Sequence, residues 1–407
     1  MGNETQNLEE SARAPRNHYA RAGHGPVRIF AQVWVAVFLA SLSTFFLLMV
    51  LSAKVFSESA SPLAANSVVL TQWLPAILAL PLIRSATRRF SPRDLLFGTE
   101  FISAAVIPLI AIVYGAFYAM IALLLVKGGM DSLSKVARAL AVKRYFSGRE
   151  LDKAASYYNT AMLAGSGVGA LFGALLLNVL SLASILAICS LCHIVAGCLY
   201  ILLPRGHEDK QTSASAPVPI SKLNPRLQAG FFYFIAAVAL YQGFQNVARS
   251  AFPTEQLGMS EAGIALIQTI TSFAYILGAL FAARISVAEN RYDRVGPGVH
   301  IFALTMLIPL PLVTEVSYGL ILYGGFAFAF EVAFAVHMRF LIVASPKEQL
   351  SNIVASANAF ALAAMVAVAF LGSFAVERFG LFWVTCAFLL LATSVPFVIK
   401  LLVRSPK

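Results

Sequence analysis

Apolar segments of about 20 residues recur along the whole chain, and this pattern most constrains how it can fold. An α-helix rises about 1.5 Å per residue, so about 20 apolar residues cross the roughly 30 Å hydrocarbon core of a bilayer. Hydrophobic residues make up 59% of the 407 residues and charged residues only 12%, against roughly 25% charged residues in soluble domains. A water-soluble fold could not bury this much apolar surface. We therefore expect an all-α polytopic membrane protein.

Turn and charge signals separate these apolar segments into twelve predicted transmembrane helices. The predicted spans are 29–53, 63–83, 95–114, 116–141, 154–177, 180–203, 227–250, 262–285, 298–314, 317–343, 353–375 and 380–402. Strands of a membrane β-barrel are excluded because these runs are too long and lack strict alternation. The predicted domains are a cytoplasmic tail 1–28, a six-helix bundle 29–203, a linker 204–226, a second six-helix bundle 227–402 and a short tail 403–407. The linker is predicted from its proline, serine and charge content.

Basic residues indicate the orientation of the chain in the membrane. They gather in one set of loops, around 84–93, 143–153, 284–294 and 339–347, and in both termini and the linker. Cytoplasmic loops retain Lys and Arg, so both termini are predicted to be cytoplasmic. The expected location is the plasma membrane, or the inner membrane of a Gram-negative cell. The net charge of +11 is then a record of topology, and no nucleic-acid partner is expected. No cleavage site follows the polar residues 1–28, so no removable signal peptide is expected.

The two halves of the chain echo each other. "GRELDKAASYYN" (148–159) precedes the fifth span and "PKEQLSNIVASAN" (346–358) precedes the eleventh. Asn159 pairs with Asn358 and Gly173 with Gly372, each at an offset of 199 (358 − 159, 372 − 173). A shared offset at equivalent places predicts two pseudo-symmetric repeats; chance similarity between two apolar helices is the alternative.

Ionisable residues lie deep inside the fourth and tenth spans. Lys127 is about twelve residues into its span, roughly 18 Å along the helix, and Asp131 follows one turn later on the same face. Glu331 occupies the symmetry-related place, 200 residues after Asp131 (331 − 131), and His337 lies nearer the cytoplasm. A charge at the bilayer centre costs about 2.5–3.5 kcal/mol on insertion scales, so it faces a partner or water. We predict that Lys127, Asp131 and Glu331 meet in one cavity, with His337 on a proton path. The alternative is an ion pair that clamps the two halves.

Other polar side chains in the spans are predicted to face the same cavity. They are Gln72, Gln242, Gln245 and Asn246. For each, a hydrogen bond between helices is the alternative. Glu100, Lys135 and Arg138 lie nearer the ends of their spans and are expected at the membrane interface instead.

The sequence gives no sign of enzymatic chemistry. "CSLCH" (189–193) matches the C-x-x-C-H pattern of haem attachment, but it lies in the middle of a span, where attachment machinery cannot reach it. The cysteines are interpreted as small packing residues. No phosphate-binding loop, metal-ligand cluster or nucleophile–base set is recognisable in the sequence. We therefore predict a protein that is not an enzyme and has no cofactor or metal.

Six plus six spans, cytoplasmic termini and a polar central linker resemble the major facilitator superfamily, and the resemblance covers the chain beyond residue 28. "GSGVGALFGA" (165–174) is similar to the antiporter motif G-x-x-x-G-P-x-x-G-G, with alanine in place of its proline and its last glycine. The resemblance implies that Gly165, Gly169 and Gly173 take part in gating. Plain packing of small residues is the alternative.

The loop signature of this superfamily, G-x-L-x-D-R-x-G-R-R, is retained unevenly. "RSATRRFSPRD" (84–94) keeps only basic residues, whereas "ENRYDRVGPG" (289–298) keeps Asp293 and Arg294. The resemblance implies that these two residues form a latch at one gate. In the fourth span, Lys127 followed by two glycines loosely resembles the basic residue of the drug or metabolite:proton antiporters.

These features predict a secondary active transporter. The resemblance implies proton-coupled efflux of a small amphipathic or zwitterionic compound by alternating access, so the expected partners are a small-molecule substrate, protons and the lipid bilayer. One alternative is a dedicated metabolite or siderophore permease or exporter. Another, from a different class, is a non-transporting assembly factor or sensor on the same fold.

Overall fold

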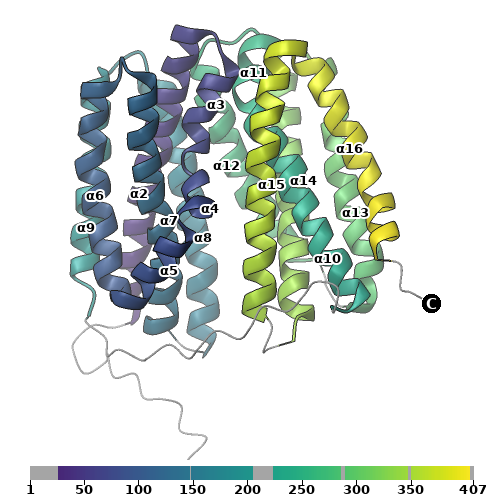
Figure 1. Cartoon of the computed structure of the whole chain (residues 1–407), viewed down its shortest axis with the longest axis horizontal. Helices are drawn as coiled ribbons and strands as arrows, with labels where there is room; N and C mark the ends of the chain where they lie inside the picture. Colours follow the sequence, from purple (N-terminus) through teal and green to yellow (C-terminus); the bar gives the residue numbers. More distant parts are fainter. Residues whose placement is uncertain (1–25, 147, 205–222, 286–288, 347–349, 404–407) are drawn as a thin grey trace, which may run out of the picture.

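The computed structural model describes residues 26–146, 148–204, 223–285, 289–346 and 350–403. In this part of the chain the regular structure is helical throughout, without a strand. Ten of the helices described are long and apolar enough to cross a membrane. This confirms the prediction of an all-α polytopic membrane protein, and Figure 1 shows the long helices standing roughly side by side.

The first half of the chain contributes eight helices to the described structure. They are α2 (Pro26–Ser59), α3 (Pro62–Leu70), α4 (Leu74–Leu78), α5 (Leu80–Arg89), α6 (Pro92–Val113), α7 (Phe117–Tyr145), α8 (Gly148–Leu176) and α9 (Leu182–Ile201). Several begin at side-chain caps, such as Ser91 and Ser181, whose hydroxyls accept hydrogen bonds from the first turn of α6 and of α9.

The second half contributes the remaining described elements. They are α10 (Pro225–Ala236), η3 (Ala237–Gln242), α11 (Gly243–Ala251), η4 (Phe252–Gln256), α12 (Ala262–Ala282), α13 (Glu289–Leu307), η5 (Leu310–Leu312), α14 (Val316–Ala344), α15 (Leu350–Phe379) and α16 (Leu381–Leu402). The elements η3 and η4 are π-helical turns and η5 is a 3₁₀ turn. From α10 to η4 the chain forms one continuous membrane-length segment.

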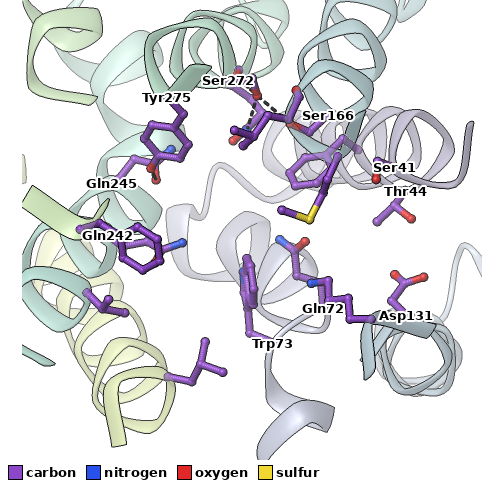
Figure 2. Close-up of a pocket in the computed structure, with 18 of the residues that line it drawn as sticks. Ser41, Thr44, Gln72, Trp73, Asp131, Ser166, Gln242, Gln245, Ser272 and Tyr275 are labelled. Carbon is purple, nitrogen blue, oxygen red and sulfur yellow. Dashed lines mark hydrogen bonds between the residues drawn. The ribbon is translucent and has the colours of Figure 1, made fainter. Parts of the chain in front are cut away.

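The predicted second span, 63–83, is not one helix but the three short helices α3, α4 and α5. Pro75 and Pro81 lie in the first turns of α4 and α5, where proline is tolerated because the first amides of a helix lack partners. Between α3 and α4 the chain makes a turn, closed by a 3.0 Å hydrogen bond from the Trp73 amide to the Leu70 carbonyl. Because of this turn, the side chains of Gln72 and Trp73 point towards the interior (Figure 2).

The fifth predicted span corresponds to α8, whose described apolar part, Thr160–Leu176, is shorter than the other spans. Together with the broken second span and the ten long helices, it accounts for the twelve predicted passes. The described helices extend beyond several predicted bounds, as in α2, because the apolar pattern marks the hydrocarbon core and not the helix ends.

The helices pack as two bundles. In the first, α2 packs against α8 and α9, and α6 against α7 and α9; in the second, α14 packs against α10, α12 and α13. In Figure 1 helices of the first half lie on the left and α13, α14 and α16 on the right. The principal contacts between the halves are α8 with α12 and α3 with α15. These pairs are the fifth with the eighth span and the second with the eleventh, as two pseudo-symmetric bundles require.

Glycines of α8 allow close packing on two sides of that helix. A Cβ atom on Gly165 or Gly169 would overlap backbone of α2, at the carbonyl oxygens of Phe38 and Leu42. A Cβ on Gly173 would lie 3.4 Å from the Cβ of Ala265 on α12. The predicted gating glycines therefore differ in what they contact. Gly165 and Gly169 pack within the first half, and Gly173 faces the second half as well.

The residue bounds of the predicted domains stay a prediction. Most of the linker 204–226 and most of both terminal tails, 1–28 and 403–407, lie outside the described residues. Helix α9 ends at Ile201 and α10 begins at Pro225, just inside the predicted linker.

Candidate functional site

A cavity of about 350 Å³ lies between the two halves (Figure 2). Figure 2 shows Ser41, Thr44 and Asp131 on one side, and Gln242, Gln245 and Tyr275 on the other. The charged residues in its lining are Glu100, Asp131, Lys135, Arg138, Arg249 and Glu331, and the aromatic ones include Trp73, Tyr275, Phe330 and Phe334. Both signs of charge and apolar rings thus face one space.

Lys127 and Asp131 form an ion pair along α7. The Lys127 Nζ lies 2.7 Å from the Asp131 Oδ2 and donates to the Thr44 Oγ1 at 2.5 Å. The spacing of four residues places both side chains on one helix face. Lys127 is buried, whereas Asp131 reaches the cavity lining. The pair links α7 to α2, both in the first half, so this ion pair does not clamp the two halves.

Glu331 lies on the second-half wall of the cavity, apart from that pair. Its side chain is buried and lines the cavity. It packs against α12, where a Cβ on Gly278 would lie 2.9 Å from the Glu331 Cβ. Among the described residues, no hydrogen bond or ion pair joins Glu331 to a protein group. The structure therefore places Asp131 and Glu331 around one cavity without bringing Lys127 and Glu331 into contact.

His337 does not line the cavity. It is buried inside the second half, with its Nδ1 2.6 Å from the Tyr292 hydroxyl and its ring stacked on Tyr233 at a centroid distance of 5.4 Å. In this conformation it lies behind the cavity wall, so it is not on the proton path on which it was predicted to lie.

Three of the four predicted polar residues line the cavity: Gln72, Gln242 and Gln245. Gln245 Oε1 accepts a hydrogen bond from the Tyr275 hydroxyl at 2.6 Å. Asn246 is buried behind this wall, where its Oδ1 accepts from the Arg249 Nη2 at 2.8 Å.

Glu100 is buried in the cavity wall. Its Oε2 lies 2.6 Å from the His193 Nδ1, and its Oε1 accepts from the Ser134 hydroxyl at 3.0 Å. Lys135 and Arg138 also line the cavity, and the Lys135 Nζ lies 4.4 Å from the centre of the Trp73 ring. The predicted interfacial depth of these three residues stays a prediction. Their place in the cavity lining was not predicted, because position along a span gives only depth, whereas the helix face decides what a residue meets.

Arg249 was missed by the sequence reasoning. It lies on α11, is 5% exposed and lines the cavity. Its Nε and Nη1 atoms have no hydrogen-bond partner among the described residues. The available signal was a cluster of polar residues, Gln245, Asn246 and Arg249, one helical turn apart within an apolar span.

Asp293 and Arg294 do not form a pair with each other. Asp293 Oδ2 lies 3.0 Å from the Arg226 Nη2, and these side chains are 55% and 46% exposed. This contact joins α13 to α10 within the second half, and Arg294 is exposed. Exposed ion pairs contribute about 0–1 kcal/mol, so any latch here is weak in this conformation.

Hydrogen bonds between the halves close one end of the cavity. The Asn66 side-chain amide donates to the Ser373 hydroxyl at 2.7 Å, and the Leu63 amide donates to Glu377 at 3.1 Å. Both bonds lie near the turns that end α2 and α15. In the other direction, the lining reaches Arg138 and Asn358, near the opposite ends of α7 and α15. The cavity is therefore sealed at the α2–α3 turn and extends towards the opposite end.

The family model of the Major Facilitator Superfamily matches residues 33–248, more than half of the chain. The chain belongs to the Major Facilitator Superfamily. A search of curated proteins finds no match. The fold is similar to that of a bacterial homolog of the human lysosomal transporter Spinster, described as inward-facing and unoccupied, with 13% identity and a TM-score of 0.69 over 94% of this chain and 99% of that chain. It is also similar to the nucleoside transporter NupG, with 12% identity and a TM-score of 0.72 over 93% of this chain and 100% of that chain.

At these identities the solved structures show the fold alone. Membership of the superfamily and the two-bundle fold indicate a secondary transporter, and the cavity between the halves of this superfamily member is its candidate transport site. The superfamily consists in general of non-enzymatic proteins, in line with the absence of enzyme motifs from the sequence. Among the described residues, no group of three His, Cys, Asp or Glu side chains is placed to hold a metal ion.

Proposed function

We propose that the protein exports a small amphipathic or zwitterionic compound in exchange for protons, by alternating access. Glu331 carries this proposal: it is a buried carboxylate that faces the cavity and has no partner among the described residues. A charge in the membrane interior is costly unless it meets a partner or water. A carboxylate in this setting can be neutralised by a proton taken from one side and released to the other when the cavity changes sides.

Asp131 is less suited to this role. Its carboxylate already accepts from Lys127 at 2.7 Å, and that neighbouring positive charge favours the ionised form. Glu331 has no such neighbour in contact, so its protonation can follow the side to which the cavity opens.

The lining of the cavity supports the proposed substrate class. Acidic and basic side chains are distributed over both halves, and Trp73, Phe330 and Phe334 supply apolar rings. A compound with an apolar body and polar or charged ends can satisfy both kinds of wall. Nucleosides belong in a screening panel because one protein of similar fold transports them.

The proposed cycle starts from a cavity open to the cytoplasm. The end closed by hydrogen bonds, at the α2–α3 turn, is the end that the basic-residue pattern predicts to be outside the cell. Two solved structures of similar fold, of a bacterial Spinster homolog, are described as inward-facing. Export as the direction rests on the likeness of the glycine-rich segment 165–174 to the antiporter motif.

The test uses purified protein in liposomes with an imposed pH gradient. A panel of labelled small zwitterions, amphipathic amines and nucleosides is screened, and the first compound that accumulates serves for the variants. Glu331→Gln should abolish accumulation driven by the gradient yet leave downhill exchange intact, because the cavity is kept and the titrating group is lost. Glu261→Gln, outside the cavity at the start of α12, is the matched control and should behave as the native protein. Full gradient-driven accumulation by the Glu331 variant would exclude this residue as the proton carrier.

A further inference from the structure

Helix α11 is polar yet buried along its whole length. All nine residues from Gly243 to Ala251 are buried, and they include Gln245, Asn246, Arg249 and Ser250. Buried polar groups are normally hydrogen-bonded, since an unpaired donor costs about 1–3 kcal/mol and a charged one costs more. The partners of these side chains therefore need to be accounted for.

The two amide oxygens of this cluster are occupied, but the Ser250 hydroxyl and several nitrogen donors are not. Gln245 Oε1 accepts from the Tyr275 hydroxyl at 2.6 Å, and Asn246 Oδ1 accepts from the Arg249 Nη2 at 2.8 Å. Four nitrogen atoms have no partner among the described residues: Gln245 Nε2, Asn246 Nδ2, and Arg249 Nε and Nη1. Arginine can only donate, so the orientation of the Asn246 amide is fixed by its bond to Arg249. The cluster therefore has more N–H donors than acceptors, and the donors surround the positive charge of Arg249.

Three of the four unpaired nitrogen atoms belong to Gln245 and Arg249, which line the cavity, although the atoms themselves are covered by protein in this conformation. Asn246 and Ser250 lie behind these two residues. The π-helical turns η3 and η4 flank α11 on both sides; such turns change the face that a helix presents and are frequent at functional sites. The irregular backbone thus holds this donor cluster at the wall of the cavity.

Unlike Arg249, the other cations of the cavity leave no buried nitrogen atom without a partner among the described residues. Lys135 lies over the Trp73 ring at 4.4 Å, and Arg138 Nε donates to the Ser134 carbonyl at 3.2 Å. Glu331 lines the same cavity as Arg249, but no ion pair joins them in the described structure. Arg249 is thus a buried positive charge without a counter-charge in contact, an arrangement that is costly in a protein interior.

We propose that Arg249 and Gln245 form a subsite for a carboxylate group, so that the transported compound is an organic carboxylate or a zwitterion with its carboxylate against α11. An ionised carboxylate only accepts hydrogen bonds, through two oxygen atoms with about four lone-pair sites, which complements the four unpartnered nitrogen donors. The bonds would be charge-assisted and therefore strong. The subsite rests on the proposed transport function, because it names the chemical class of that substrate.

The first test measures the thermal stability of the full chain in detergent without added ligand. A buried charge that serves ligand binding lowers the stability of the protein without ligand. The Arg249→Gln variant should therefore melt at the same temperature as the native protein or at a higher one. A clearly lower melting temperature would show that Arg249 serves to hold helices together through Asn246, and it would overturn the assignment.

The second test measures the binding of defined probes by the stabilisation that they confer. Benzoate, phenylacetate and 4-phenylbutyrate are each compared with their neutral amides, which have the same size but no charge. In the native protein at least one carboxylate should bind about tenfold or more tightly than its amide, as expected for charge-assisted hydrogen bonds. Arg249→Gln should remove this preference, and Arg249→Lys should restore part of it.

Arg138→Gln is the matched control, because it removes a positive charge from the same cavity at a distance from α11. It should keep the preference for carboxylates. An equal loss in both variants would show a general attraction of anions into the cavity and would overturn the local subsite. No preference for any of the three carboxylates would also overturn it, and stabilisation by phenyl phosphate alone would replace the carboxylate by a phosphate.

These measurements are made at equilibrium without a pH gradient, so they do not depend on proton coupling. Carboxylate binding that is lost in the Arg249 variants supports the subsite even if Glu331→Gln still accumulates substrate. A normal carboxylate preference in Arg249→Gln refutes the subsite while leaving the role of Glu331 untouched.

Discussion

Replacing Lys127 by methionine tests how the ion pair on α7 stabilises the first half. Methionine keeps the length and the apolar stem of the side chain but cannot donate hydrogen bonds. The change removes the 2.7 Å contact with Asp131 and the 2.5 Å hydrogen bond to Thr44. It leaves the Asp131 carboxylate at the edge of the cavity without the cation that contacts it.

The size of the effect follows from the burial of both partners. The side chains of Lys127 and Asp131 are 2% and 15% exposed, so solvent screens their interaction little. Removing one partner of a buried pair costs about 3–5 kcal/mol, and we expect about 3 kcal/mol because Asp131 reaches the cavity and keeps some access to water. Lys127→Met combined with Asp131→Asn should recover most of this loss, since replacing both partners of a buried pair is often close to neutral.

The assay is unfolding of the purified protein in mixed micelles by titration with a denaturing detergent, with helix content as the signal. The four proteins of the double-mutant cycle give a coupling energy, which should be about 2–3 kcal/mol in favour of the pair. A Lys127→Met variant within about 1 kcal/mol of the native stability would refute the reasoning, because a buried orphan carboxylate must cost more than that. Additive losses in the double variant would equally refute the pairing of these two residues.

Two further predictions concern packing and the closed end of the cavity. Gly169→Ala should destabilise the protein by about 1–3 kcal/mol, because the new Cβ overlaps backbone at Leu42, whereas Gly298→Ala on α13, where the Cβ meets open space, should be neutral or slightly stabilising; equal melting temperatures for the two variants would contradict the close packing of α2 on α8. Glu377→Gln should raise amide hydrogen exchange in the first turn of α3 about two- to fivefold, because the carboxylate that accepts from Leu63 at a helix N-terminus loses its charge; unchanged exchange, measured by mass spectrometry, would show that this bond does not hold the two halves together.

Much of the fold could be predicted because it depends on local patterns. A span of apolar residues must form a helix in lipid, since every backbone polar group needs a partner there, and the number and order of passes followed from hydropathy alone. The break in the second span was also encoded, by Pro75 and Pro81, but it was not predicted because the average hydropathy of the segment is that of a continuous span. The π turns around α11 have no comparable local signal, and they depend on packing against neighbouring helices.

The site residues divide in the same way between local and non-local information. Lys127 and Asp131 were brought together correctly because a spacing of four residues fixes their proximity on one helix. The Thr44 hydroxyl that completes this contact comes from another helix and could not be predicted. The partners of Glu100 could not be predicted for a similar reason: His193 and Ser134 lie on α9 and α7, and only the assembled bundle makes these side chains meet.

The sequence itself shows that the two halves differ around their buried carboxylates, Asp131 and Glu331. The repeat offset of 200 that relates Asp131 to Glu331 relates Lys127 to position 327 (127 + 200), where the second half has Ala327. The first half therefore supplies its carboxylate with a cation one turn away, and the second half does not. If both halves carried the pair, neither carboxylate would be left to change its protonation as the cavity changes sides. In the proposed proton-coupled cycle, Glu331 is therefore the carboxylate without a cation one turn away, and it is the one that carries the proton.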